Sequence, residues 1–406
     1  MKILIATSSV TPNAGIPSFN RELCGLLSKD NELHLLVDEK LDSYVGYEKT
    51  FSTANMDIYD YHDISKLLKT LAKEDYDVII NSNSHAMALM SAYMNDSVRI
   101  ITVSHSLGTM DCDNAVFNHK YVDSIIALSE SCRNYISHRF RLKKEKISVV
   151  FNSVADNPNA SSIRKTKIEA PVLKIVFAGG SAASKSPDIV IQVIKDLCKT
   201  SLPFKFYWLG ITTPPLKKIQ PFKDIRLLLP KDNRIIVTGL LPQQVAAELI
   251  ASCNVFLAPS RREGFPMALL EAMRVGCIPI VSDYKIANQE IIRDGVNGFL
   301  IPHKQIHSFS ARIIDIISHH QKYRNIYELS YKTFVDELSF PVWKGNIQSI
   351  LYNAKVSHKK RIRLSKFSFK LITLRFKFLN IYNLLENYIT EVTPCALKIF
   401  KYYKTK

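Results

Sequence analysis

The chain has 406 residues and a formal net charge of +17, with 47% hydrophobic and 22% charged residues. That length is enough for two globular domains with full-sized cores. No run reaches the roughly 18 to 20 apolar residues of a membrane span, and the N-terminal MKILIATSSV lacks the long apolar stretch of a signal peptide. The seven scattered cysteines contain no CxxC pair, which indicates reduced thiols in a cytoplasmic protein and no zinc site.

Short apolar runs alternate with helix-length segments in the first part of the chain. We expect helices at 17–29, 84–95 and 129–140, and strands at 2–8, 33–38, 76–82, 99–104, 124–129 and 147–152. This alternation predicts a parallel, doubly wound sheet with both faces covered.

A polar stretch at 156–171 interrupts the alternation and is typical of a linker. The pattern then resumes, with expected strands at 172–180, 204–210, 234–239, 254–260 and 277–283. The fold class is therefore α/β, with two Rossmann-like domains over 1–160 and 170–338 that face a cleft. In such sheets, ligands bind beyond the carboxyl ends of the strands.

Two acids, Glu263 and Glu271, bracket a nearly apolar segment in EGFPMALLEAMRVGCIPI. The first lies in an expected strand-to-helix turn and the second inside the helix. The amides of 265–268 would be uncapped donors at the helix start, which suit a diphosphate or sugar hydroxyls. Carboxylates accept hydrogen bonds from hydroxyls, so a sugar nucleotide is the favoured ligand. Alternatively, Glu263 is a loop acid and Glu271 a surface acid paired with Arg274.

The surroundings of these acids carry a resemblance to a known family. The segment APSRREGFPMALLEAMRVGCIPIVSD resembles the donor-site motif of retaining GT-B glycosyltransferases of family 4 (glycosyl transferases group 1), and the similarity extends over roughly 233–301. The resemblance implies transfer of a sugar from a nucleotide-diphosphate sugar with retention of configuration. It also implies that no metal or other cofactor is needed, and the chain has no Asp-x-Asp motif.

The resemblance assigns the donor contacts. Glu263 would bind hydroxyls of the donor sugar and Glu271 those of the ribose. Glu290 matches a family glutamate in a loop facing the cleft. The remaining donor-binding candidates line the sugar and diphosphate or lie beside the nucleobase; they are Gly264, Phe265, Pro266, Met267 and Ala268 for the former, and Leu240 and Leu241 for the latter.

A second donor element is FAGGSAASKSPDIV. Its Lys185 matches a family lysine that stabilises the leaving diphosphate. The family arginine of this element falls on Gly180, so half of the cationic clamp is missing. Either Arg261 or Arg262 could replace it.

Two candidates lie in the N-terminal domain. Gly15 stands in the loop where the family has a glycine pair near the donor phosphates. His105 follows the strand at 99–104, where the family keeps a histidine near the transferred sugar. The resemblance therefore makes His105, Lys185 and Glu263 the catalytic candidates, and we adopt front-side attack of the acceptor as the hypothesis for retention.

The expected acceptor is a glycan or lipid-linked glycan of a cell-surface polysaccharide pathway. A sugar-nucleotide epimerase of GT-B architecture is the enzymatic alternative, and it would need no acceptor. A nicotinamide oxidoreductase is disfavoured because no GxGxxG follows a strand. We expect no nucleic-acid partner, because the positive charge collects in a tail and does not spread over a folded face.

The segment after the second domain begins with an expected crossover helix at 339–354. The tail at 355–406 carries 13 Lys/Arg against two acids. As a helix it places Phe369 and Phe376 opposite one apolar stripe, formed by Phe367, Leu371, Leu374, Phe378, Ile381 and Leu385. We expect the tail to bind an anionic membrane surface at the inner face of the cytoplasmic membrane. The alternative is a helix packed on the body or on a partner subunit.

Overall fold

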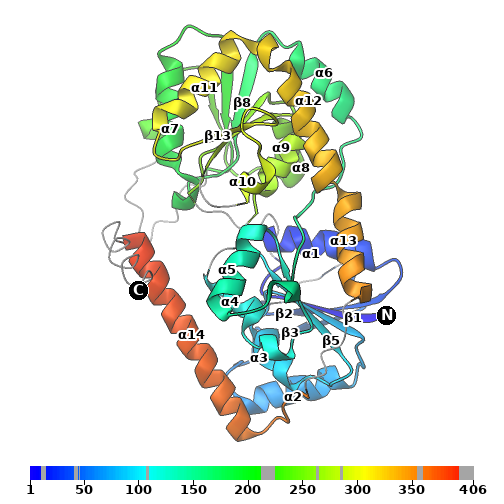
Figure 1. The fold of residues 1–406 in the computed structure, drawn as a ribbon. Coiled ribbons are helices and arrows are strands. Elements are labelled where there is room, and N and C mark those ends of the chain that lie inside the picture. Colours follow the sequence, from blue (N-terminus) through cyan, green and yellow to red (C-terminus); the bar gives the residue numbers. More distant parts are fainter. Residues whose placement is uncertain are drawn as a thin grey trace. The chain divides into compact units, whose positions relative to one another are not determined.

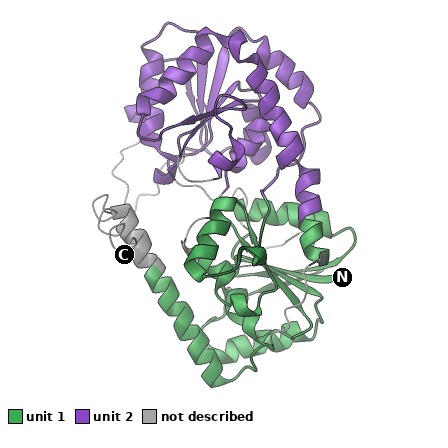
Figure 2. Cartoon of the chain, in the orientation of Figure 1, with its two compact units in different colours: residues 1–150, 347–406 green, residues 151–346 purple. Residues whose placement is uncertain are grey.

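The computed structural model describes residues 1–10, 15–40, 44, 46–106, 109–211, 225–261, 265–283, 287–353 and 360–392. The chain divides into two compact units (Figure 2). Unit 1 comprises residues 1–150 and 347–406, and unit 2 comprises residues 151–346. The division falls inside α13 (Phe340–Asn353), the helix that the sequence marks as a crossover.

Among the described residues of unit 1, seven parallel strands form a sheet in the order β3-β2-β1-β4-β5-β6-β7. The strands are β1 (Lys2–Thr7), β2 (Glu32–Val37), β3 (Lys49–Ser52), β4 (Val78–Ser82), β5 (Arg99–Ser104), β6 (Ser124–Ala127) and β7 (Ile147–Val149). The central β1 is buried over Ile3 to Thr7, as expected for a parallel strand covered on both faces.

The helices of unit 1 lie around this sheet (Figure 1). They are α1 (Gly15–Leu27), α2 (Tyr61–Ala72), α3 (His85–Met90), α4 (Thr109–Val116), α5 (Glu130–Phe140) and α14 (Lys366–Val392). Side-chain caps explain where several begin. Asp60 accepts hydrogen bonds from the amides of His62 and Asp63 at the start of α2, and Ser129 accepts one from Cys132 at the start of α5.

Among the described residues of unit 2, six parallel strands form a sheet in the order β10-β9-β8-β11-β12-β13. The strands are β8 (Leu173–Phe177), β9 (Phe204–Trp208), β10 (Ile235–Val237), β11 (Val255–Ala258), β12 (Ile278–Ser282) and β13 (Phe299–Ile301). The helices are α6 (Ala160–Ile168), α7 (Pro187–Cys198), α8 (Gln243–Ala251), α9 (Met267–Met273), α10 (Asn288–Ile291), α11 (Ile306–Ser318) and α12 (Arg324–Thr333). The predicted α/β class with two parallel sheets is confirmed.

The edge strands β3 and β13 and the helix α6 were not identified from the sequence. The edge strands β3 and β13 are short, and β3 is only partly buried, so their apolar patterns are weak. The expected linker at 156–171 is wrong, because it contains α6. This helix packs in unit 2: the Arg164 guanidinium lies 3.6 Å from the Tyr331 ring centroid, and Lys167 Nζ donates to the Val275 carbonyl at 3.2 Å.

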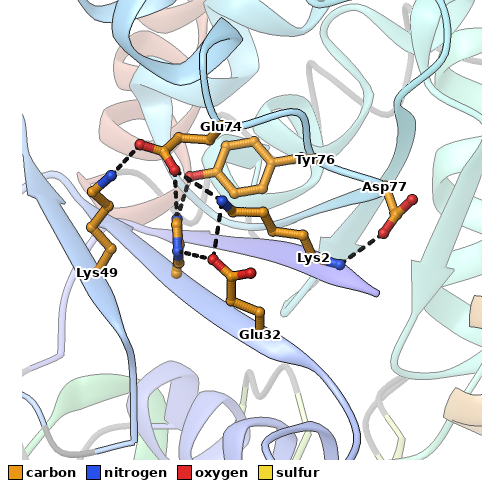
Figure 3. A network of polar contacts seen from close by, with 7 residues as sticks. Lys2, Glu32, Lys49, Glu74, Tyr76 and Asp77 are labelled. Carbon is orange, nitrogen blue, oxygen red and sulfur yellow. Dashed lines mark hydrogen bonds and ion pairs between the residues drawn. The ribbon is translucent and has the colours of Figure 1, made fainter.

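A polar network lies at the amino-terminal ends of the unit 1 strands (Figure 3). The Lys2 ammonium lies 3.0 Å from both Glu32 and Glu74. The buried His34 ring bonds the Tyr76 hydroxyl at 2.8 Å and Glu32 at 3.0 Å. Hydrogen bonds from Lys49 and Lys2 lower the pKa of the Glu74 carboxyl group to about 2. This network lies at the strand ends opposite those where parallel sheets bind ligands, so its role is structural.

Candidate active site

The loops that follow β8, β9 and β10 are bonded to one another at the carboxyl end of the unit 2 sheet. The Gly180 amide donates to the Leu209 carbonyl at 3.1 Å, and the Gly210 amide donates to the Gly239 carbonyl at 3.2 Å. The Trp208 indole N–H donates to the Gly180 carbonyl at 2.9 Å. These bonds hold three loops as one backbone platform at the end of the sheet where ligands bind in this class of fold.

Gly180 stands where the family motif has its arginine, and its backbone explains the departure. Its φ of +58° lies in the left-handed region, and a Cβ there would lie 2.9 Å from the Gly210 carbonyl oxygen. Any side chain at this position would strain the backbone and press against the neighbouring loop. The platform therefore requires glycine here.

Lys185 ends a one-turn 3₁₀ segment, Ala183–Lys185, just before α7. Its amide donates to the Ala182 carbonyl at 2.9 Å, and its side chain is half-buried. The next residue, Ser186, has a φ of +56°, and its hydroxyl lies 3.1 Å from His303 Nε2. The turn lies beside the loop after β8, because a Cβ on Gly179 would be 3.1 Å from the Lys185 Cβ.

Arg261 joins the same loop from the end of β11. Its amide donates to the Ser184 carbonyl at 2.8 Å, next to Lys185 in the chain. Its guanidinium donates to Asp188 at 2.6 Å, in the first turn of α7. A second cationic side chain therefore flanks the Lys185 turn. Gly180, at the position where the resemblance expects an arginine, supplies no charge. The other sequence candidate, Arg262, lies outside the described residues, as do Glu263 and Gly264.

The described part of the apolar motif begins at Phe265. Phe265 and Pro266 are buried, and the Phe265 ring packs 5.7 Å from that of Phe151. Pro266 occupies the N-cap position of α9, so Met267 is the first helical residue. The Met267 amide donates to the Phe265 carbonyl at 3.1 Å. The expectation of uncapped donors over 265–268 is therefore wrong at Met267, and Pro266 has no N–H to offer.

Glu271 lies in α9 and is half-buried. Burial raises the pKa of its carboxyl group, and Arg274 partly opposes that shift. Arg274 Nη1 instead donates to the Ala155 carbonyl at 2.7 Å, and within the described residues the two side chains form no ion pair. The carboxylate is thus partly desolvated and has no direct ion pair with Arg274, which favours hydrogen bonds from ligand hydroxyls.

The remaining unit 2 candidates follow β10 and β12. Leu240 is 72% exposed, and Leu241 is half-buried. Glu290 is half-buried in α10. In the same helix, the Asn288 side chain is fully buried, and neither its oxygen nor its nitrogen has a hydrogen-bond partner among the described residues. Such an orphaned amide calls for a ligand or water, and Asn288 was not among the residues that the sequence suggested.

His105 and Gly15 belong to unit 1, whereas the other candidates belong to unit 2. His105 follows β5 and is 7% exposed. Its Nε2 lies 2.8 Å from the Ser82 hydroxyl, and its ring meets Phe19 edge-on at 4.9 Å. Gly15 is the first residue of α1, and a Cβ there would meet no atom of the described residues within 4 Å. Packing therefore accounts for the orientation of His105 but gives no steric reason for glycine at 15.

His303 is a further residue that the sequence did not suggest. It follows β13, and its amide donates to Asp283 at 3.1 Å. Burial and the Arg261 charge lower the pKa of its imidazole, against the opposing pull of Asp188 and Asp283. The signal that marks it is the short apolar run FLI before Pro302, which is the missed strand β13. Across the described ranges, no group of three or more His, Cys, Asp or Glu side chains could hold a metal ion.

Two family models match the chain in tandem. The model described as Glycosyltransferase Family 4 matches residues 26–157, and the model described as Glycosyl transferases group 1 matches residues 159–333. The first thus covers most of the body of unit 1 and the second most of unit 2.

Curated relatives are similar to parts of the chain or to most of it. A putative colanic acid biosynthesis glycosyltransferase of Salmonella typhimurium is 26% identical, over 37% of this chain and 38% of its own length. The lipopolysaccharide 1,6-galactosyltransferase of Salmonella typhimurium is 27% identical, over 57% of this chain and 63% of its own length. Both alignments span less than two thirds of the relative. An amylovoran biosynthesis glycosyltransferase of Erwinia amylovora is 22% identical, over 84% of this chain and 98% of its own length.

Solved structures show the same fold. The Anabaena protein HepE in complex with UDP-glucose matches with a TM-score of 0.66 at 17% identity, over 87% of this chain and all of that chain. A glycosyltransferase from Rickettsia africae matches with a TM-score of 0.68 at 12% identity, over 87% of this chain and 98% of that chain. With two parallel sheets and both halves matched by family models, the chain belongs to the GT-B glycosyltransferases of family 4 (glycosyl transferases group 1).

Proposed function

We propose that this glycosyltransferase moves a hexose from a nucleotide-diphosphate sugar to a glycan or lipid-linked acceptor, with retention of configuration. The observation that carries the proposal is the Lys185 turn, which Arg261 flanks through its bond to Ser184. Two cations beside a backbone platform suit a leaving diphosphate, whose charge grows as the sugar departs. The half-buried Glu271, with its raised pKa, suits the ribose hydroxyls.

In this proposal, Arg261 replaces the arginine that Gly180 cannot supply. Asp188 holds the guanidinium at 2.6 Å and orients it beside the start of α7. Glu263 would bind hydroxyls of the donor sugar, Leu240 the face of the nucleobase, and His105 the transferred sugar. The acceptor would attack from the side of the leaving phosphate, which would take its proton. No metal is needed in this scheme.

The structural neighbour that holds UDP-glucose supports a nucleotide-sugar donor, and UDP-glucose and UDP-galactose are the first donors to test. The relatives named for colanic acid, lipopolysaccharide and amylovoran favour a cell-surface polysaccharide as the product. They are glycosyltransferases, which favours transfer over the epimerase alternative. We place the enzyme in the cytoplasm, bound peripherally to the inner face of the membrane where a lipid-linked acceptor is found.

The test begins with a thermal-shift screen of UDP, GDP and ADP, followed by release of the nucleotide from its sugar in the presence of candidate acceptors. Arg261→Ala should lower kcat by about tenfold to a hundredfold, because one cation at the leaving group is lost. Arg293→Ala is the matched control, since Arg293 is an exposed unit 2 arginine paired with Glu337.

Equal effects of the two arginine variants would contradict the role of Arg261. Glu263→Ala should abolish transfer, and near-normal turnover would refute its part in binding the sugar. Conversion of the donor without any acceptor would instead support an epimerase. Analysis of the product anomer by NMR decides retention.

A further inference from the structure

The tail helix α14 has two apolar faces, and unit 1 uses only one of them. Phe369 is 3% exposed and Phe376 is fully buried. The Phe376 ring meets that of Phe117 at 4.7 Å, and the Phe369 ring meets that of Tyr61 at 6.0 Å. The helix contacts α2, α3 and α4, so it is anchored along unit 1 (Figure 1). The alternative of packing on the body is therefore correct for this face.

The opposite face of α14 is apolar and exposed. Its side chains are between 44% and 74% exposed; they are Phe367, Leu371, Leu374, Phe378, Ile381 and Tyr382. At about 100° per residue they fall within an arc of about 100°, centred roughly opposite Phe376. We call these six residues the outer stripe. The side chain of Leu385, also expected in the stripe, lies outside the described side chains.

The outer stripe concentrates the exposed large hydrophobic side chains of this protein on one helix face. In the described part of the chain, thirteen large hydrophobic side chains are exposed, and six of them form this stripe. Scattered exposed hydrophobic residues are ordinary, whereas a contiguous patch marks a surface that binds something. In the described residues, no helix, α14 included, is long and apolar enough to span a membrane.

The charged residues of the chain segment that carries the stripe are all positive. Residues 360–385 contain seven Lys/Arg and no Asp or Glu. Lys366, Lys370 and Lys377 border the stripe on one side, and Arg375 borders it on the other; all four are exposed. Lys377 Nζ lies 4.5 Å from the Tyr59 ring centroid, and the Arg375 guanidinium lies 5.2 Å from that of Phe117. These two cationic side chains, one on each side of the stripe, therefore contact aromatic rings of unit 1.

We propose that the outer stripe is the docking surface for an anionic lipid bilayer, with α14 lying in the plane of the interface and its inner face fixed to unit 1. An apolar stripe bordered by lysines and arginines suits acyl chains beneath anionic headgroups. A second copy of the chain would bring like-charged borders together, which opposes that occupant. The inference deepens the membrane partner of the proposed function, and its test does not depend on catalysis.

The test is co-sedimentation of the full chain with vesicles, with and without phosphatidylglycerol in phosphatidylcholine. Leu374→Glu/Phe378→Glu should reduce partitioning into the mixed vesicles by about tenfold or more, because two apolar side chains that would be buried in the bilayer are replaced by charged ones. Val296→Glu/Val335→Glu is the matched control, because it adds the same charge at exposed valines of unit 2. Binding of wild type should weaken in high salt and in pure phosphatidylcholine.

Leu374→Ser/Phe378→Ser removes the apolar surface without adding charge, and it should also lose binding. Unchanged thermal unfolding of both stripe variants excludes misfolding, and an unchanged UDP thermal shift separates this result from the donor chemistry. Wild-type partitioning of the stripe variants would overturn the proposal. So would a dimer in sedimentation equilibrium that dissociates in the stripe variants, because the occupant would then be a second copy.

Discussion

The backbone at Gly180 combines a φ of +58° with a Cβ position 2.9 Å from the carbonyl oxygen of Gly210. Gly295 has a similar φ of +72°, but a Cβ there would meet nothing within 4 Å. The two glycines therefore separate two physical effects. One is the cost of a left-handed backbone for an L-residue, and the other is the close approach of two loops.

We predict that Gly180→Ala lowers the free energy of unfolding of unit 2 by about 3 kcal/mol, and Gly295→Ala by about 1 kcal/mol. Both tryptophans of the chain, Trp208 and Trp343, belong to unit 2 and are buried. Urea unfolding followed by tryptophan fluorescence therefore reports this unit. Equal losses in the two variants would show that the loop contact contributes nothing.

Residue identity alone did not disclose these constraints. The motif around Gly180 showed that an arginine is missing, but it did not show that a side chain there would approach the Gly210 carbonyl oxygen of another loop. Likewise, Arg261 and Arg262 were equivalent as sequence candidates. The structure adds for Arg261 a bond from its amide to the Ser184 carbonyl, a contact between residues far apart in the chain, whereas Arg262 lies outside the described residues.

Elements with strong local patterns were predictable. The central strands read as continuous apolar runs because parallel strands are buried on both faces. The edge strands β3 and β13 could not be identified in this way. The edge strands β7 and β10 are as short, but they lie in the longer runs ISVVFN and RIIVTG, whereas β3 is the half-polar KTFS and β13 is FLI alone, between Gly298 and Pro302. The linker over 156–171 was misjudged because α6 is held by contacts with Val275, Glu328 and Tyr331, and not by an apolar stripe of its own.

The two faces of α14 allow a direct comparison of a buried and an exposed phenylalanine on one helix. Phe376 is fully buried against Phe117, whereas Phe378 is 64% exposed. We predict that Phe376→Ala lowers the free energy of unfolding of unit 1 by about 3 to 5 kcal/mol, and that Phe378→Ala changes it by less than about 0.5 kcal/mol. Amide hydrogen exchange in the strands of unit 1 measures the difference.

The fluorescence transition of unit 2 should not move in either phenylalanine variant, which provides an internal control. Similar destabilisation by the two variants would mean that the outer stripe is covered in the folded protein. Deletion of the tail is therefore not a clean test of membrane binding, because it also removes Phe369 and Phe376 from the core of unit 1.

For the whole molecule, the two proposed ligands should act on different units. We predict that UDP slows amide hydrogen exchange at 176–186, 208–211 and 265–275 in unit 2, and leaves α14 unchanged. Anionic vesicles should slow exchange over 366–382 and leave the unit 2 loops unchanged. Binding protects the amides that it orders, so protection of α14 by UDP, or of the unit 2 loops by vesicles, would contradict this assignment.

The sequence by itself determined the α/β alternation, the two sheets and the family motif from Glu263 to Glu271, because periodicity and motif spacing are local properties of a chain. It also identified one apolar stripe on the tail helix, with Phe369 and Phe376 opposite it. Only the tertiary structure decided that Phe369 and Phe376 are buried while the outer stripe is exposed, and that Arg261 joins the Lys185 turn. Those outcomes depend on contacts between distant residues, which no local pattern contains.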